Sequence, residues 1–326
     1  MYLCINRTCQ ASQRCSNRWV VFLYTHGSSF YQNISNATRQ HVELLQDRGL
    51  LISDEQKAEE YISTIGYFRL TAYLYPLLES PKTEHRFKSG ATFQKALDMY
   101  RFDRKLRIIL LNEIEKIEIA VRSRITNCVA QSCGDIFGMS NPAMFAKSGW
   151  YMTSMTAING ELTKSKEDFI LHFRQTYSDT YPPAWMIAEI LPLGTLTHVY
   201  SNLKDNTIRK KVAAEFGLTH KVLESWLIVL YGLRNMYSHH SRTWNKELAI
   251  ITMEPKTLGY KWIDLSCTDK RRIYYRICMI RYFLFSIAPN NSLKSRLVDL
   301  FREFPTVDTL AMGFPKGWSD DCFWND

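Results

Sequence analysis

The most constraining feature of the 326-residue sequence is one long helical pattern of apolar residues. From about Phe93 to Gln131, apolar residues recur at intervals of three and four, which is the period of one face of an α-helix. They are Leu106, Leu110, Ile114, Ile117, Val121 and Ile125. Because such a stripe is stable only when it is buried, we expect other helices to pack along it.

Shorter helical patterns occupy much of the remaining sequence. One begins at Ala37 and ends at Gly49, after which Ser53 offers an N-cap with Gln56 at the capping-box position of a second helix. Further helices are predicted over 184–191, 195–203, 206–215, 219–240 and 270–287. Alternating strand patterns are few, so the predicted fold class is all-α.

Residues 1–36 differ from the rest of the chain. They contain three of the eight cysteines and many Ser and Asn residues, and they lack any sustained periodicity. We interpret them as a poorly ordered N-terminal extension that precedes a helical domain over 37–326.

The net charge and the hydropathy of the chain bear on which partners it can bind. Lys and Arg number 41 against 32 Asp and Glu, a formal charge of +9 that favours RNA or DNA. A basic but inert surface would account for that charge equally well. No apolar run approaches the ~20 residues that span a bilayer, so we expect a cytoplasmic protein with no membrane association.

The cysteines do not form a metal-binding pattern. There is no Cys-x-x-Cys pair, and no histidine lies at zinc-ligand spacing beside them. We therefore expect reduced thiols that act as small apolar core residues, with no metal site and no cofactor.

Polar and titratable residues crowd at the end of the predicted helix 219–240. That helix is at first apolar on nearly all sides, and its end then carries Arg234, Asn235, His239, His240 and, just beyond, Arg242. Polar groups at the tip of a buried helix are costly unless they serve a site or satisfy one another. This segment is the candidate functional site, and a structural cluster is the alternative.

Ideal helical geometry does not bring the arginine and the histidine of this segment together. Asn235 and His239 share a face, whereas Arg234 lies about 140° from His239 around the axis. Either the helix loosens near Ser238, or a second copy of the chain completes the site across a two-fold axis. The sequence leaves both open, and we expect the second, a homodimer.

Two charges lie near the centre of the long apolar stripe. At about 100° per residue, Arg107 and Glu118 fall within about 40° of that centre and about 16 Å apart along the axis. Because buried charges need partners, we expect them to pair with other helices rather than with each other. A salt bridge at the edge of the core and a role in the site are both open.

The polar segment resembles the signature of a known nuclease class. Arg234-Asn235-x-x-x-His239 is similar to the Arg-x(4–6)-His pattern of HEPN-domain ribonucleases. Together with other motifs in consistent order, it resembles the Abi-like (AbiD/AbiF) abortive-infection family over about residues 37–326. Those motifs are 61–70, Phe102-Asp-Arg-Lys-Leu-Arg107, 114–123, Ser225-Trp226, 233–245 and 312–318.

The resemblance implies a fold and a reaction. The fold is a HEPN-type helical bundle with additional helices, whose core covers about 93–245. The reaction is metal-independent, toxin-like RNA cleavage in phage defence, in which the 2′-hydroxyl attacks the adjacent phosphate. Histidine suits proton transfer near neutral pH, and arginine suits phosphate binding.

Roles for the site residues follow from the resemblance. His239 is the general acid or base, with His240 as second choice, Arg234 binds the phosphate and stabilises the transition state, and Asn235 orients the reacting groups. Arg242 contacts the RNA backbone or forms a surface salt bridge.

The two charges of the long helix are also assigned to the substrate site. Glu118 is expected to fix Arg234 or a histidine, and Arg107 is placed near the substrate. The expected partners are RNA, a second copy of the chain, and an antitoxin protein or RNA. The alternative functions are a non-cleaving RNA-binding module of a defence or toxin–antitoxin complex, and a purely structural interaction protein.

Overall fold

The computed structural model describes residues 38–266 and 268–325, and its regular structure there is helical. Twelve α-helices, α2 to α13, and short 3-10 turns make up the regular elements of this part of the chain. Extended backbone pairs within it only as isolated bridges. The predicted all-α class is confirmed. The extension predicted over 1–36 lies outside the described residues.

The chain divides into two compact units, and the division falls within helix α5 (Phe93–Cys133). The first unit ends at Phe102 and the second begins at Asp103. The sequence gives no sign of this division, because the helical period continues through it without a break. The domain core expected over about 93–245 stays a prediction.

The first unit contains α2 (Thr38–Asp47), α3 (Glu55–Ile65) and α4 (Tyr67–Leu74). The N-cap predicted for α3 is wrong by one residue: the carboxylate of Asp54, not the hydroxyl of Ser53, accepts the Lys57 amide at 2.9 Å. A carboxylate satisfies that donor and also interacts favourably with the helix dipole. The short helix α4 was not predicted.

The second unit contains the rest of α5 and eight further helices. They are α6 (Ser148–Lys164), α7 (Asp168–Thr176), α8 (Ala184–Ile190), α9 (Leu193–Asn202), α10 (Asn206–Ala214), α11 (His220–Ser238), α12 (Ile273–Ile287) and α13 (Leu293–Glu303). The predictions for α8 to α12 are confirmed to within three residues at each end. Helix α13 was missed.

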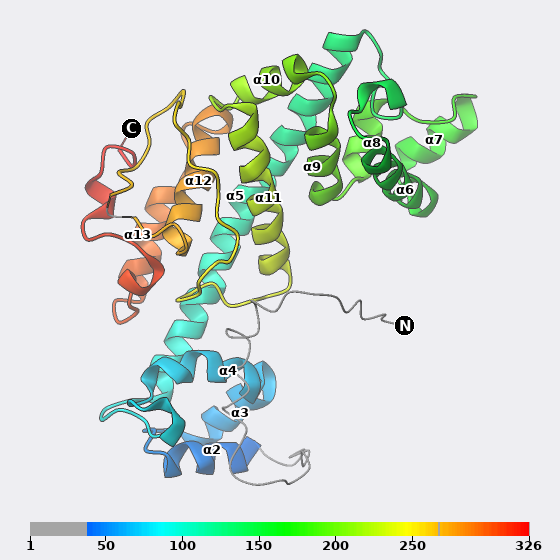
Figure 1. Cartoon of the computed structure of the whole chain (residues 1–326). Coiled ribbons are helices and arrows are strands. Elements are labelled where there is room, and N and C mark those ends of the chain that lie inside the picture. The colour runs from blue at the N-terminus through cyan, green and yellow to red at the C-terminus, as the bar shows by residue number, and fades with distance from the viewer. Residues whose placement is uncertain (1–37, 267, 326) are drawn as a thin grey trace. The chain divides into compact units, whose positions relative to one another are not determined.

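Helix α5 contacts α11, α12 and α13 within the second unit, and Figure 1 shows it between α11 and α12. The apolar stripe that predicted this helix is fully buried, since none of its six residues from Leu106 to Ile125 is more than 1% exposed. The expectation that other helices pack along the stripe is therefore confirmed.

Helix α12 is buried on all sides over its first twelve residues, including two arginines. Arg276 donates to the hydroxyl of Thr252 at 3.1 Å and to the carbonyl of Ile250. Arg281 donates to the carbonyls of Phe323 and Trp324 at 3.0 and 3.3 Å. Both arginines thus hold irregular segments against the core by satisfying backbone acceptors that would otherwise be buried without a donor.

Within the described residues, no helix is both long enough and apolar enough to cross a membrane.

Replacement of the core tryptophan of α11 tests this packing. Trp226 is 0% exposed, and its indole donates to the Met253 carbonyl at 3.1 Å. We expect Trp226→Ala to lower the free energy of unfolding by about 3–5 kcal/mol, measured by urea denaturation followed by circular dichroism. The control Trp185→Ala removes a side chain that is 44% exposed and should change stability by about 0.5 kcal/mol or less. Equal losses for the two variants would contradict this assignment of the core.

Candidate active site at the end of helix α11

Helix α11 ends at Ser238, in the middle of the polar segment. The His239 amide still donates to the Asn235 carbonyl at 3.0 Å, and the Ser241 amide then reaches back to the Met236 carbonyl at 2.9 Å. His240 adopts a left-handed conformation, with φ of 56°. Such a residue commonly closes a helix C-terminus. Of the two arrangements considered from the sequence, the local break near Ser238 is present, and the second copy stays a prediction.

The residues at this helix end divide between core and surface. Leu233 and Tyr237 are buried, whereas the Arg234 side chain is 45% exposed and both histidines are exposed. Asn235 and Arg242 are half-buried. Burial raises the pKa of the Tyr237 phenol far above its ordinary value, and the nearby Asp103 carboxylate raises it further, so this hydroxyl stays neutral. The helix is thus anchored on one side and presents its polar groups on the other.

Glu118 of α5 holds Arg234. Its Oε2 lies 3.7 Å from Arg234 Nε, and its Oε1 lies 2.5 Å from Arg122 Nη2. The Glu118 side chain is only 12% exposed, so these two arginines supply the charges that its burial requires. The partner found is Arg234, one of the two alternatives expected. Arg122 was missed, although its position four residues after Glu118 on the same helix was visible in the sequence.

Arg107 lies beneath the segment that follows the histidines. It is 6% exposed, donates to the Asp103 carboxylate of its own helix, and approaches the Ser241 carbonyl at 3.4 Å. The expectation that Arg107 pairs with another helix is therefore wrong, because its carboxylate partner lies on α5 itself. Its contact with the Ser241 carbonyl anchors the loop. The RNA contact predicted for Arg107 stays a prediction.

The structure does not join Arg234 to His239 directly. Within the described chain, no hydrogen bond or ion pair links them, and Arg234 instead pairs with Glu118. Both residues are nevertheless exposed at the same helix end, less than two turns apart.

A further cation, Lys246, lies near this site and was not predicted. Lys246 Nζ lies 3.6 Å from the Met236 sulfur. Burial lowers the pKa of Lys246, and the positive charge of Arg242 lowers it further. No feature of the sequence pattern placed Lys246 here, because an irregular segment carries it.

Fold and site together define an all-α protein in which a partly buried helix ends in a cationic, histidine-bearing segment. The family model described as Abi-like protein matches residues 60–245, more than half of the sequence, and the chain belongs to this family. The matched range includes Arg234, His239 and their α5 neighbours. Membership suggests a role in abortive infection, a bacterial defence against phage. No curated protein and no solved structure gives a significant match.

The Glu118 pair generates a stability prediction. We expect Glu118→Gln to lower the free energy of unfolding by about 1–3 kcal/mol, because Arg122 and Arg234 lose their shared carboxylate. Urea denaturation measures the change. Glu115→Gln is the matched control, since Glu115 is exposed on the same helix, and it should shift stability by about 0.5 kcal/mol or less. Indistinguishable curves for the two variants would argue against the ion pair.

Proposed function

We propose that this protein is a HEPN-type endoribonuclease that cleaves RNA without a metal ion and acts as an abortive-infection effector. One observation carries the proposal: Arg234, held by Glu118, is exposed at the same helix end as His239 and His240. Family membership and the resemblance of Arg234-Asn235-x-x-x-His239 to the HEPN signature support it.

These residue types suit intramolecular phosphoryl transfer in RNA. The 2′-oxygen forms a bond to phosphorus and the bond from phosphorus to the 5′-oxygen breaks, which leaves a 2′,3′-cyclic phosphate and a 5′-hydroxyl. A histidine takes the proton from the 2′-hydroxyl, and a protonated histidine gives one to the departing oxygen. We assign His239 to proton transfer, with His240 as second choice. DNA lacks the attacking hydroxyl and is not a substrate.

Positive groups supply binding and transition-state stabilisation. The forked guanidinium of Arg234 can donate two parallel hydrogen bonds to phosphate oxygens, and its charge opposes the negative charge of the phosphorane. Asn235 orients the reacting groups. We assign Arg242 and Lys246 to the binding of a neighbouring phosphate.

A second copy of the chain is part of the proposal. Ile228 and Tyr231 are 43% and 39% exposed on α11, and Asn235 follows on the same face. Ile250, 50% exposed, lies beside Gly232 of this helix. An apolar strip that leads directly to the polar segment favours a self-complementary contact, which would bring a second Arg234 and His239 near the first.

Cleavage by variants of the polar segment tests the proposed reaction. Purified protein with EDTA should cut labelled RNA to fragments with cyclic-phosphate ends. Arg234→Ala and His239→Ala should each lower the rate by about 100-fold or more, because charge stabilisation or proton transfer is lost. The same RNA with a 2′-deoxynucleotide at the cut position should resist cleavage.

Exposed residues of the same types provide the controls. Arg302→Ala on α13 and His172→Ala on α7 should retain full activity. In bacteria, the wild type should slow growth and protect against phage, and the double variant Arg234→Ala/His239→Ala should do neither. Equal cleavage by the wild type and the double variant would reject the nuclease. RNA binding without cleavage by the wild type would favour the non-cleaving module.

The proposed dimer has its own test. Ile228→Lys places a charge in the centre of the apolar strip and should convert a dimer to a monomer in light-scattering measurements, because a lysine is costly to bury without a partner. Met152→Lys is the control. Met152 is 62% exposed and lies on α6, not on α11, so this substitution should leave the mass unchanged. A wild type that is monomeric at high concentration would remove the second copy from the proposal.

A further inference from the structure

A buried carboxylate on α5 contacts the loop that follows the two histidines. Asp103 is 0% exposed and accepts hydrogen bonds from three groups. They are the Thr243 amide at 3.0 Å, the Trp244 amide at 2.6 Å and the Arg107 guanidinium. We propose that Asp103 is a positioning residue for RNA cleavage, which with Arg107 fixes the loop and thereby places His239 and His240. The inference rests on the ribonuclease function proposed above.

Arg107 and Asp103 of α5 contact both a carbonyl and amide groups of the loop backbone. Arg107 lies 3.4 Å from the Ser241 carbonyl, and Asp103 receives the amides of the second and third residues after it. The histidines come immediately before Ser241. Only one residue, Arg242, separates the Arg107 contact from the Asp103 contacts, so the chain has little freedom to move at this point.

The cost of burying Asp103 favours a rigid loop. A buried carboxylate is stable only when its charge is opposed and its lone pairs are satisfied. Here the loop amides donate hydrogen bonds to the Asp103 carboxylate. Displacement of the loop would remove these donors from Asp103 and the Ser241 carbonyl from Arg107. Thr243 and Trp244 are themselves buried, and the Trp244 indole donates to the Asp308 carbonyl at 3.0 Å.

The consequence for catalysis follows from the short connection to the histidines. Misplacement of a catalytic group by about 1 Å can cost about 100-fold in rate. The left-handed turn at His240 sets the direction in which the chain leaves α11, and the Asp103 contacts fix where it arrives. Asp103 does this from the protein interior and needs no contact with RNA.

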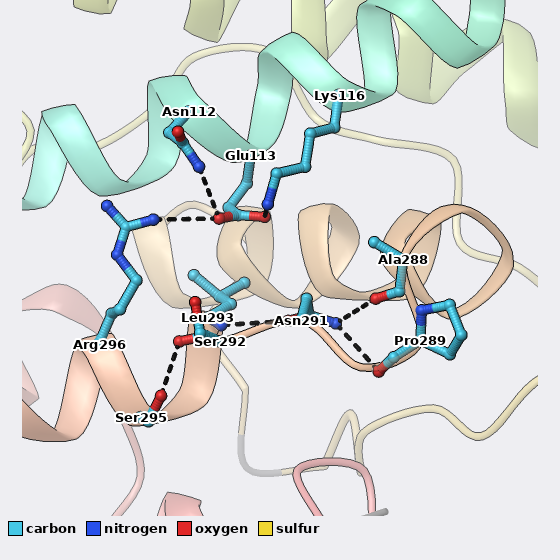
Figure 2. Close-up of polar contacts among 10 residues, drawn as sticks. All are labelled: Asn112, Glu113, Lys116, Ala288, Pro289, Asn291, Ser292, Leu293, Ser295 and Arg296. Atoms are coloured by element: carbon cyan, nitrogen blue, oxygen red, sulfur yellow. Dashed lines mark hydrogen bonds and ion pairs between the residues drawn. The ribbon is translucent and has the colours of Figure 1, made fainter.

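Glu113 provides a matched comparison on the same helix. Like Asp103 it is 0% exposed and accepts from three groups: Asn112 at 3.0 Å, Lys116 at 2.8 Å and Arg296 at 3.2 Å. Figure 2 shows that these donors come from α5 itself and from the start of α13. Glu113 therefore stabilises the fold by the same chemistry as Asp103, but away from the histidine loop.

The experiment compares Asp103→Asn with Glu113→Gln. Each variant removes one buried negative charge with little change in size, so both should lose stability by similar amounts. We expect Asp103→Asn to lower kcat by about 100-fold with little change in KM for RNA, while Glu113→Gln retains the kcat of the wild type. Amide hydrogen exchange over residues 239–245 should accelerate in Asp103→Asn only.

The possible outcomes separate this inference from the proposed function. A wild type that does not cleave RNA overturns the function and, with it, the catalytic role of Asp103. A wild type that cleaves, with Asp103→Asn and Glu113→Gln equally active, overturns the positioning role alone. If Asp103→Asn does not fold, Arg107→Lys is used at the same contact. It should lower kcat while the KM for RNA stays near that of the wild type, and unchanged kcat would equally overturn the role.

Discussion

The cost of burying carboxylates along α5 organises the second unit. Asp103, Glu113 and Glu118 all lie on this helix with side chains 0–12% exposed. A buried carboxylate demands positive charge and hydrogen-bond donors, and a single helix supplies few of them. The missing donors come from elsewhere in the chain: the loop after α11 for Asp103, Arg296 of α13 for Glu113, and Arg234 of α11 for Glu118. Each of the three carboxylates thus binds a different segment that packs against α5.

Two of these contacts position the candidate site. Glu118 orients the arginine, and Asp103 with Arg107 holds the segment beyond the histidines. The helix end between them is free to expose polar groups because Leu233 and Tyr237 anchor it in the core. A buried interior thus supports an exposed polar segment, an arrangement that fits the proposed catalytic role.

Much of the fold followed from local sequence pattern. The buried stripe of α5 and the boundaries of α8 to α12 were predicted because burial imposes a period of three to four residues. Helices α4 and α13 were not predicted. The N-cap of α3 was predicted at Ser53 instead of Asp54, because neighbouring polar residues compete for the same cap. The candidate site residues were found because Arg234, Asn235, His239 and His240 are consecutive or nearly so. The contacts of Asp103 with the Thr243 and Trp244 amides were not predicted, since they depend on what a distant segment brings to this carboxylate.

Side-chain pattern alone predicts an all-α chain, a buried helix α5 and a dense polar segment at the end of α11. These properties depend on side-chain periodicity and composition, which are local. The folded chain adds that Glu118 pairs with Arg234 and that Asp103 binds the Thr243 and Trp244 amides. Those choices join residues more than 100 positions apart, and a buried charge selects its partner by which donors the packed chain brings within reach.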